Sequence, residues 1–166
     1  MSARILIACV GNIFLGDDAF GVEVAQRLSQ ASLPDGVTVV DYGIRSYDLA
    51  YALMQPWELV ILVDAVSRGE EPGTVFAIEP DISAISDQGA NTAFDAHTMN
   101  PVSVIQMVTA LGGQCPRMID VGSEPLSVEP PGDGQFGLSE PVRAAVDEAI
   151  QLIRETVQGV TRAAAA

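Results

Sequence analysis

Short, almost uniformly apolar runs alternate with helical patterns along this chain, and that alternation most constrains its fold. The runs are rich in β-branched residues and end at turn residues, as strands buried on both faces do. Strands that alternate with helices form a mostly parallel sheet with helices on both sides. Strands are expected at residues 4–10, 37–42, 59–63, 74–78 and 118–121.

Helical patterns follow the expected strands. The first begins after Gly16 and repeats apolar residues every four positions. Asp48 is placed to cap a short second helix. Asn100, followed by Pro101, is placed to begin a third helix, and Ser139 to begin the last.

These elements predict an α/β fold, a single-domain three-layer sandwich with a mostly parallel sheet of about five strands and helices on both faces. We expect this domain to span residues 1–159 and residues 160–166 to be a disordered tail. Residues 79–96 contain Pro, Gly and scattered acidic residues, and residues 125–137 are rich in Pro and Gly. Both segments are predicted to be loops.

The charge and the cysteine content exclude several classes of function. Asp and Glu number 22 against 8 Lys and Arg, which gives a net charge of −14. Such a surface repels nucleic acids and anionic membranes, so neither is an expected partner. Cys9 and Cys115 are too few for a disulfide framework, and no stretch is as long as a membrane span. We therefore expect a cytoplasmic protein, and a monomer.

Acidic residues stand at the ends of the first three expected strands. Asp18 follows the first strand, Asp41 ends the second and Asp64 ends the third, while His97, the only histidine, precedes the Asn100 helix. In a doubly wound sheet these four residues share the edge where ligands bind. Clustered carboxylates need a cation or protons, and carboxylates with a neutral imidazole suit a divalent transition metal. Three protein ligands would leave positions open for a substrate group or water.

Each of these residues also has a purely structural interpretation. Asp17 or Asp18 can cap the first helix, which is the interpretation we prefer for Asp17. Asp41 and Asp64 can be turn residues at strand ends. It is the shared location of the acids that favours a functional site.

Three glycines in the first loop raise the alternative of a nucleotide site. Gly11, Gly16 and Gly21 follow a strand, but their spacing differs from Gly-x-Gly-x-x-Gly. The acids at 17 and 18 would also stand where a pyrophosphate needs positive potential. A non-enzymatic metal- or nucleotide-binding α/β module is thus the alternative to an enzyme.

Four sequence motifs resemble those of the hydrogenase maturation endopeptidases. Residues 11–18 (Gly-Asn-Ile-Phe-Leu-Gly-Asp-Asp) are similar to the opening motif of that family, and 63–65 (Val-Asp-Ala) to its second. Residues 95–97 (Asp-Ala-His) fall where the family carries a histidine before a helix, and 41–43 (Asp-Tyr-Gly) resemble a further acidic element. The resemblance runs from about residue 4 to the final helix.

The resemblance implies a five-stranded α/β sandwich whose nickel-contacting residues are Asp18, Asp64 and His97. The family usually has Glu where this chain has Asp18. The Asp side chain is one methylene shorter and reaches less far, so Asp17 is kept as a substitute ligand. Asp41 is a candidate general base.

The resemblance also implies the reaction. A protease of this family, commonly grouped with the aspartic-type peptidases, removes a C-terminal peptide from the large-subunit precursor of a [NiFe] hydrogenase after nickel insertion. The nickel belongs to the substrate, and no resident organic cofactor is expected. The attacking water could be activated by the metal or by a carboxylate.

Overall fold

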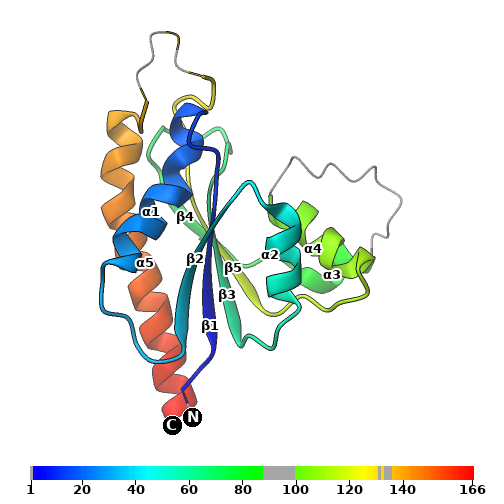
Figure 1. Ribbon diagram of the computed structural model, residues 1–166. Helices are drawn as coiled ribbons and strands as arrows, with labels where there is room; N and C mark the ends of the chain where they lie inside the picture. Colours follow the sequence, from blue (N-terminus) through cyan, green and yellow to red (C-terminus); the bar gives the residue numbers. More distant parts are fainter. Residues whose placement is uncertain (1, 88–99, 131, 133–135) are drawn as a thin grey trace.

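A mixed sheet forms the middle layer of the protein, in the strand order β2-β1-β3-β5-β4 (Figure 1). The computed structural model describes residues 2–87, 100–130, 132 and 136–166. Neighbouring strands are parallel except β4, which runs antiparallel to β5. The strands are β1 (Ile5–Val10), β2 (Val37–Gly43), β3 (Leu59–Ala65), β4 (Val75–Ile78) and β5 (Met118–Ser123).

Helices cover both faces of this sheet, which confirms the predicted three-layer α/β sandwich. Helices α1 and α5 pack together on one face, and α2, α3 and α4 lie on the other (Figure 1). Among these helices no span is both long and apolar enough to cross a membrane, as far as the described residues go. The helices are η1 (Gly16–Ala19, a 3-10 turn), α1 (Phe20–Ser29), α2 (Ser46–Leu53), α3 (Ile82–Asp87), α4 (Pro101–Ala110) and α5 (Glu140–Ala165).

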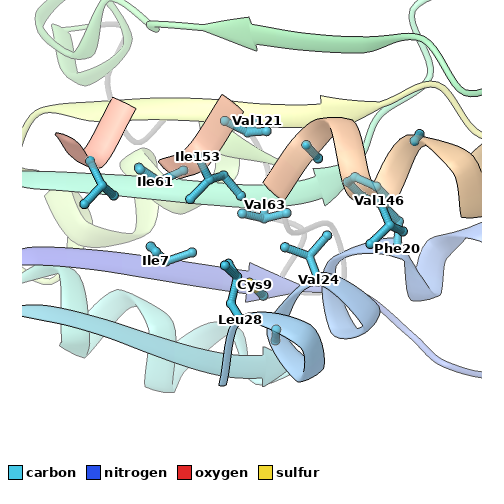
Figure 2. Close-up of a cluster of buried hydrophobic side chains, with 14 of the residues drawn as sticks. Ile7, Cys9, Phe20, Val24, Leu28, Ile61, Val63, Val121, Val146 and Ile153 are labelled. Atoms are coloured by element: carbon cyan, nitrogen blue, oxygen red, sulfur yellow. The ribbon is translucent and has the colours of Figure 1, made fainter. Parts of the chain in front are cut away.

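Alternate residues of the central strands supply two separate cores. Ile7 and Cys9 of β1 point toward α1 and α5, where they meet side chains such as Val24 and Ile153 (Figure 2). Leu6, Ala8 and Val10 point to the other face and pack against α2 and α4. This two-sided burial is why the strand sequences are continuously apolar.

The predicted start of the helix after Asn100 is confirmed. The Asn100 carboxamide oxygen accepts a hydrogen bond from the Ser103 amide at 2.9 Å, and Pro101 is the first residue of α4. Helix α2 instead begins at Ser46 without a side-chain cap, so the prediction that Asp48 caps it is wrong. Asp48 lies in the first turn and forms an ion pair with Arg45 at 3.2 Å.

Two segments are more helical than the sequence predicts. The short helix α3 lies inside the expected loop 79–96, because the Asp81 carboxylate accepts from the Ala84 amide and Ile82 and Ile85 pack against the core under α2 and α4. Helix α5 continues to Ala165, through the residues expected to form a tail. Its apolar stripe extends to Val160, which packs against the core, so the helix does not end at residue 159.

Candidate active site

A pocket of about 310 Å³ opens at the carboxyl ends of β1 and β3. Strand β1 has β2 as its neighbour in one direction across the sheet and β3 in the other, so the strand order reverses between β1 and β3. Folds of this kind bind ligands at such a topological switch point. Its polar lining comes from Asp18, Asp64, Ser67 and Asn100. The structure thus brings two of the predicted site residues together.

Asp18 reaches the pocket from the 3-10 turn η1. Its Oδ2 accepts a hydrogen bond from the Asn12 amide at 2.8 Å. Burial raises the pKa of the Asp18 carboxyl, and the Asn12 hydrogen bond opposes this rise. Gly11 lets the loop close tightly, because a Cβ at Gly11 would lie only 2.0 Å from the Asp18 carbonyl oxygen.

Asp64 lies deeper, near the end of β3, where its exposed fraction is only 8%. Burial raises the pKa of its carboxyl well above 3.8, and the negative charges of Asp18 and Asp120 raise it further, while a hydrogen bond from the Ala65 backbone opposes them. The carboxyl therefore holds a proton far more tightly than an exposed aspartate does.

Asp120 in β5 is a further buried acid, whose charge acts on Asp64, and it was not among the site residues predicted from the sequence. It is 5% exposed, and its Oδ1 has no hydrogen-bond partner among the residues that the structure describes. Burial raises the pKa of Asp120 to about 7, and the charge of Arg68 opposes the rise. The sequence does contain a signal for it: Asp120 is a lone acid inside the apolar run 118–121, and an acid within a strand buried on both faces must itself be buried.

Asp41 does not line this pocket. Cys9 pairs with Asp41 on one side and with Val63 on the other, so Asp41 is level with Val63 and one position short of Asp64. Its exposed carboxylate accepts a hydrogen bond from the Gly43 amide at 2.8 Å. Gly43 is among the residues that line the pocket, and Asp41 is not. Its role as a general base stays a prediction, without a direct contact to support it.

Asp17 points away from the pocket and is 1% exposed. Its carboxylate accepts hydrogen bonds from the amides of Leu126, Ser127 and Ser139 at 2.7–3.3 Å and from the Ser139 hydroxyl at 2.8 Å. Four bonds occupy a carboxylate's acceptor sites, so this geometry gives no support to Asp17 as a substitute ligand. Nor does Asp17 cap a helix: it ties the loop after β1 to the loop after β5.

His97 and its neighbour Asp95 lie outside the described residues. Within the described ranges, no three His, Cys, Asp or Glu side chains form a group able to hold a metal ion. Asn100, three positions after His97, does line the pocket. The third predicted ligand therefore stays a prediction.

Gly21 gives the first glycine loop a structural explanation. A Cβ at Gly21 would lie 2.2 Å from the Val10 carbonyl oxygen and 2.7 Å from that of Val63, so this glycine lets α1 lie directly on the ends of β1 and β3. Two carboxylates, Asp18 and Asp64, then face the pocket in place of the positive potential that a pyrophosphate requires. The charge of the pocket disfavours a nucleotide.

Comparison with known proteins identifies relatives named as hydrogenase maturation proteases. A family model described as hydrogenase maturation protease matches residues 22–156. The chain is 35% identical over 154 residues to a protein of Methanocaldococcus jannaschii assigned to the hydrogenase maturation proteases, covering 90% of this chain and 93% of that one. It is 28% identical to the hydrogenase 2 maturation protease of Escherichia coli, over 90% of this chain and 88% of the other. The structure of the hydrogenase maturating endopeptidase HybD from Escherichia coli superposes with a TM-score of 0.73 at 27% identity, covering 95% of this chain and 93% of that chain.

Proposed function

Because this chain belongs to the hydrogenase maturation protease family, we propose that it removes the C-terminal peptide of a [NiFe] hydrogenase large-subunit precursor after nickel has been inserted. The observation that carries the proposal is the meeting of Asp18 and Asp64 in one pocket at the switch point of the sheet. The family membership supports the endopeptidase class, and the pocket supports a cation as the feature recognised.

The nickel in this proposal is part of the substrate. Asp18 and Asp64 would bind it through carboxylate oxygens and His97 through a ring nitrogen, a donor set that suits a divalent transition metal. Because the pKa of Asp64 is raised, nickel binding would have to displace the proton that the buried carboxyl holds, so binding should weaken as the pH falls. The Asn12 amide donates to Asp18 Oδ2 at 2.8 Å, a contact that limits the motion of this carboxylate.

Binding the nickel would hold the neighbouring peptide bond beside the pocket. Fixing a reacting group in place removes much of the entropic barrier to its reaction. The attacking water is activated either by the metal or by a carboxylate, and a carboxylate route would place the chain with the aspartic-type peptidases. A precursor without nickel would lack the group that Asp18 and Asp64 hold, so cleavage would wait for metal insertion.

The test uses this protein with its cognate precursor, prepared with and without nickel. Mass spectrometry follows the released C-terminal peptide. We expect the peptide to be released from the nickel-loaded precursor only, and no release by the Asp64→Asn variant. Asp35→Asn, which changes an exposed acid of a turn, is the matched control and should cleave normally. Efficient cleavage of the nickel-free precursor would refute recognition by nickel. Cleavage of neither form would favour the alternative, a non-enzymatic binding module.

A further inference from the structure

A second, apolar groove is lined in part by the loop that supplies Asp18. It has a volume of about 370 Å³, and its walls include Ile13, Phe14, Val22 and Phe136. Phe14 is 62% exposed and Phe136 is 70% exposed, although both are among the most hydrophobic side chains. Their rings meet edge to face with centroids 6.4 Å apart. Two exposed aromatic side chains that form one wall mark a surface that another molecule covers.

Hydrogen bonds anchor the loop that carries Phe14. The Phe14 amide donates to the Asn12 carboxamide oxygen at 2.9 Å. Four hydrogen bonds to the Asp17 carboxylate join the Phe14 loop to residues 126, 127 and 139 of the segment that carries Phe136. A preformed groove binds more tightly than a flexible one, because less conformational entropy is lost on binding.

The groove and the acidic pocket share one loop. Phe14 is three residues from Gly11, which lines the pocket, so their Cα atoms are at most about 11 Å apart. A specific protein interface covers about 800 Å² on each partner, equivalent to a disc of roughly 16 Å radius. An interface of that size centred on the pocket would therefore also cover Phe14.

The charge of the groove favours an apolar occupant. Glu23 is the only charged residue in its described wall, and Arg27 Nε donates to its carboxylate at 3.2 Å. The chain as a whole carries a net charge of −14, so a compensated apolar surface is where a partner can dock without facing unpaired acids.

We infer that this groove is the docking site of the hydrogenase large-subunit precursor, and that it takes up an apolar side chain of the precursor close to its C-terminal segment. This inference rests on the proposed function and assigns the partner's second point of contact. The pocket would read the metal, and the groove would supply affinity. A second copy of this chain is disfavoured as the occupant because it would bring its own acidic pocket edge against this one.

The experiment compares two double variants in cleavage of the nickel-loaded precursor. Phe14→Ser with Phe136→Ser removes the aromatic wall, while Tyr51→Ser with Leu111→Ser removes exposed apolar side chains of α2 and of the end of α4. We expect the first to raise KM at least about tenfold with kcat nearly unchanged, as loss of central interface residues does. The control should change KM less than about twofold. Circular dichroism checks that both fold.

The outcomes separate this inference from the proposed function. If the wild type cleaves and the Phe14/Phe136 variant has the same KM, the inference is overturned and the protease function stands. If the wild type does not cleave, the proposed function fails, and the docking site is then judged by the Kd for the precursor, which must weaken only in the Phe14/Phe136 variant. Analytical ultracentrifugation decides the remaining case: a wild-type dimer that the Phe14/Phe136 variant abolishes, with KM unchanged, would assign the groove to a second copy.

Discussion

Replacing Asp120 with Asn should change how the stability of this protein depends on pH. Asp120 is buried in β5 with an unpartnered oxygen within the described structure, and burial raises its pKa from 3.8 to about 7. Between those two pH values the folded chain holds a proton that the unfolded chain has released. The free energy of unfolding therefore falls as pH rises through this window and levels off above about pH 7.

The size of the effect follows from the two pKa values. A tenfold difference in proton affinity is worth about 1.4 kcal/mol, so the charged Asp120 destabilises the fold by about 4 kcal/mol above pH 7. Asn cannot ionise, so the variant lacks this penalty. Its buried amide carries a cost of about 1–3 kcal/mol that does not depend on pH. The difference in stability between variant and wild type should consequently shift by about 4 kcal/mol in favour of the variant from pH 4 to pH 8.

Urea unfolding followed by circular dichroism at four or five pH values measures this difference. Asp64 titrates in both proteins, but the variant lacks the Asp120 charge that helps to raise the pKa of Asp64, which adds a pH-dependent difference of the same sign. Asp35→Asn, a change at an exposed turn, serves as the control and should show no pH-dependent difference. A stability difference for Asp120→Asn that stays constant within about 0.5 kcal/mol across the range would refute the reasoning, since it would show that burial does not hold a proton on Asp120.

Four further changes test other parts of the structure. Asp64→Asn should leave thermal stability unchanged or higher, because it removes a buried charge beside other acids, yet abolish processing; a large fall in Tm would favour a structural role. Gly21→Ala should lower the free energy of unfolding by at least about 1–3 kcal/mol, since its Cβ would overlap the Val10 carbonyl, and urea unfolding with no loss would contradict that contact. Asp17→Ala should cost roughly 3 kcal/mol or more in the same assay by leaving buried amides without acceptors, and a neutral result would show that the loop has other anchors. His97→Ala should weaken Cd²⁺ binding in calorimetry, and equal affinities would remove this histidine from the site.

The sequence predicted the fold because the signals for it are local or repeated. Apolar runs mark strands buried on both faces, and Asn100 with Pro101 marks a helix start by the chemistry of two adjacent residues. Helix α3 escaped prediction because its stability comes from the packing of Ile82 and Ile85 against other elements, which no local pattern reveals.

The site was predictable in part for the same reason. Asp18 and Asp64 follow strands whose ends must meet at the switch point, and the structure places both in one pocket. The sequence favoured a structural role for Asp17 and the site for Asp18, and the structure separates the two in the same way. The partners of Asp17 at residues 126, 127 and 139 are distant in the chain, so no local pattern predicts them. Asp41 misses the pocket because register aligns it with Val63, and register between parallel strands cannot be read from one sequence.

The position of β5 between β3 and β4 has a consequence for synthesis on the ribosome. Within the described part of the chain, strand β4 pairs with β5 alone, which follows it about 40 residues later. At roughly 5–20 residues per second, β4 and the outer edge of β3 wait a few seconds for their partner. The anchors of Asp17 at residues 126, 127 and 139 emerge later still. A nascent chain therefore carries Asp17 well before the hydrogen-bond donors that hold it have been made, so the loop after β1 gains these anchors only when the last third of the polypeptide has been synthesised.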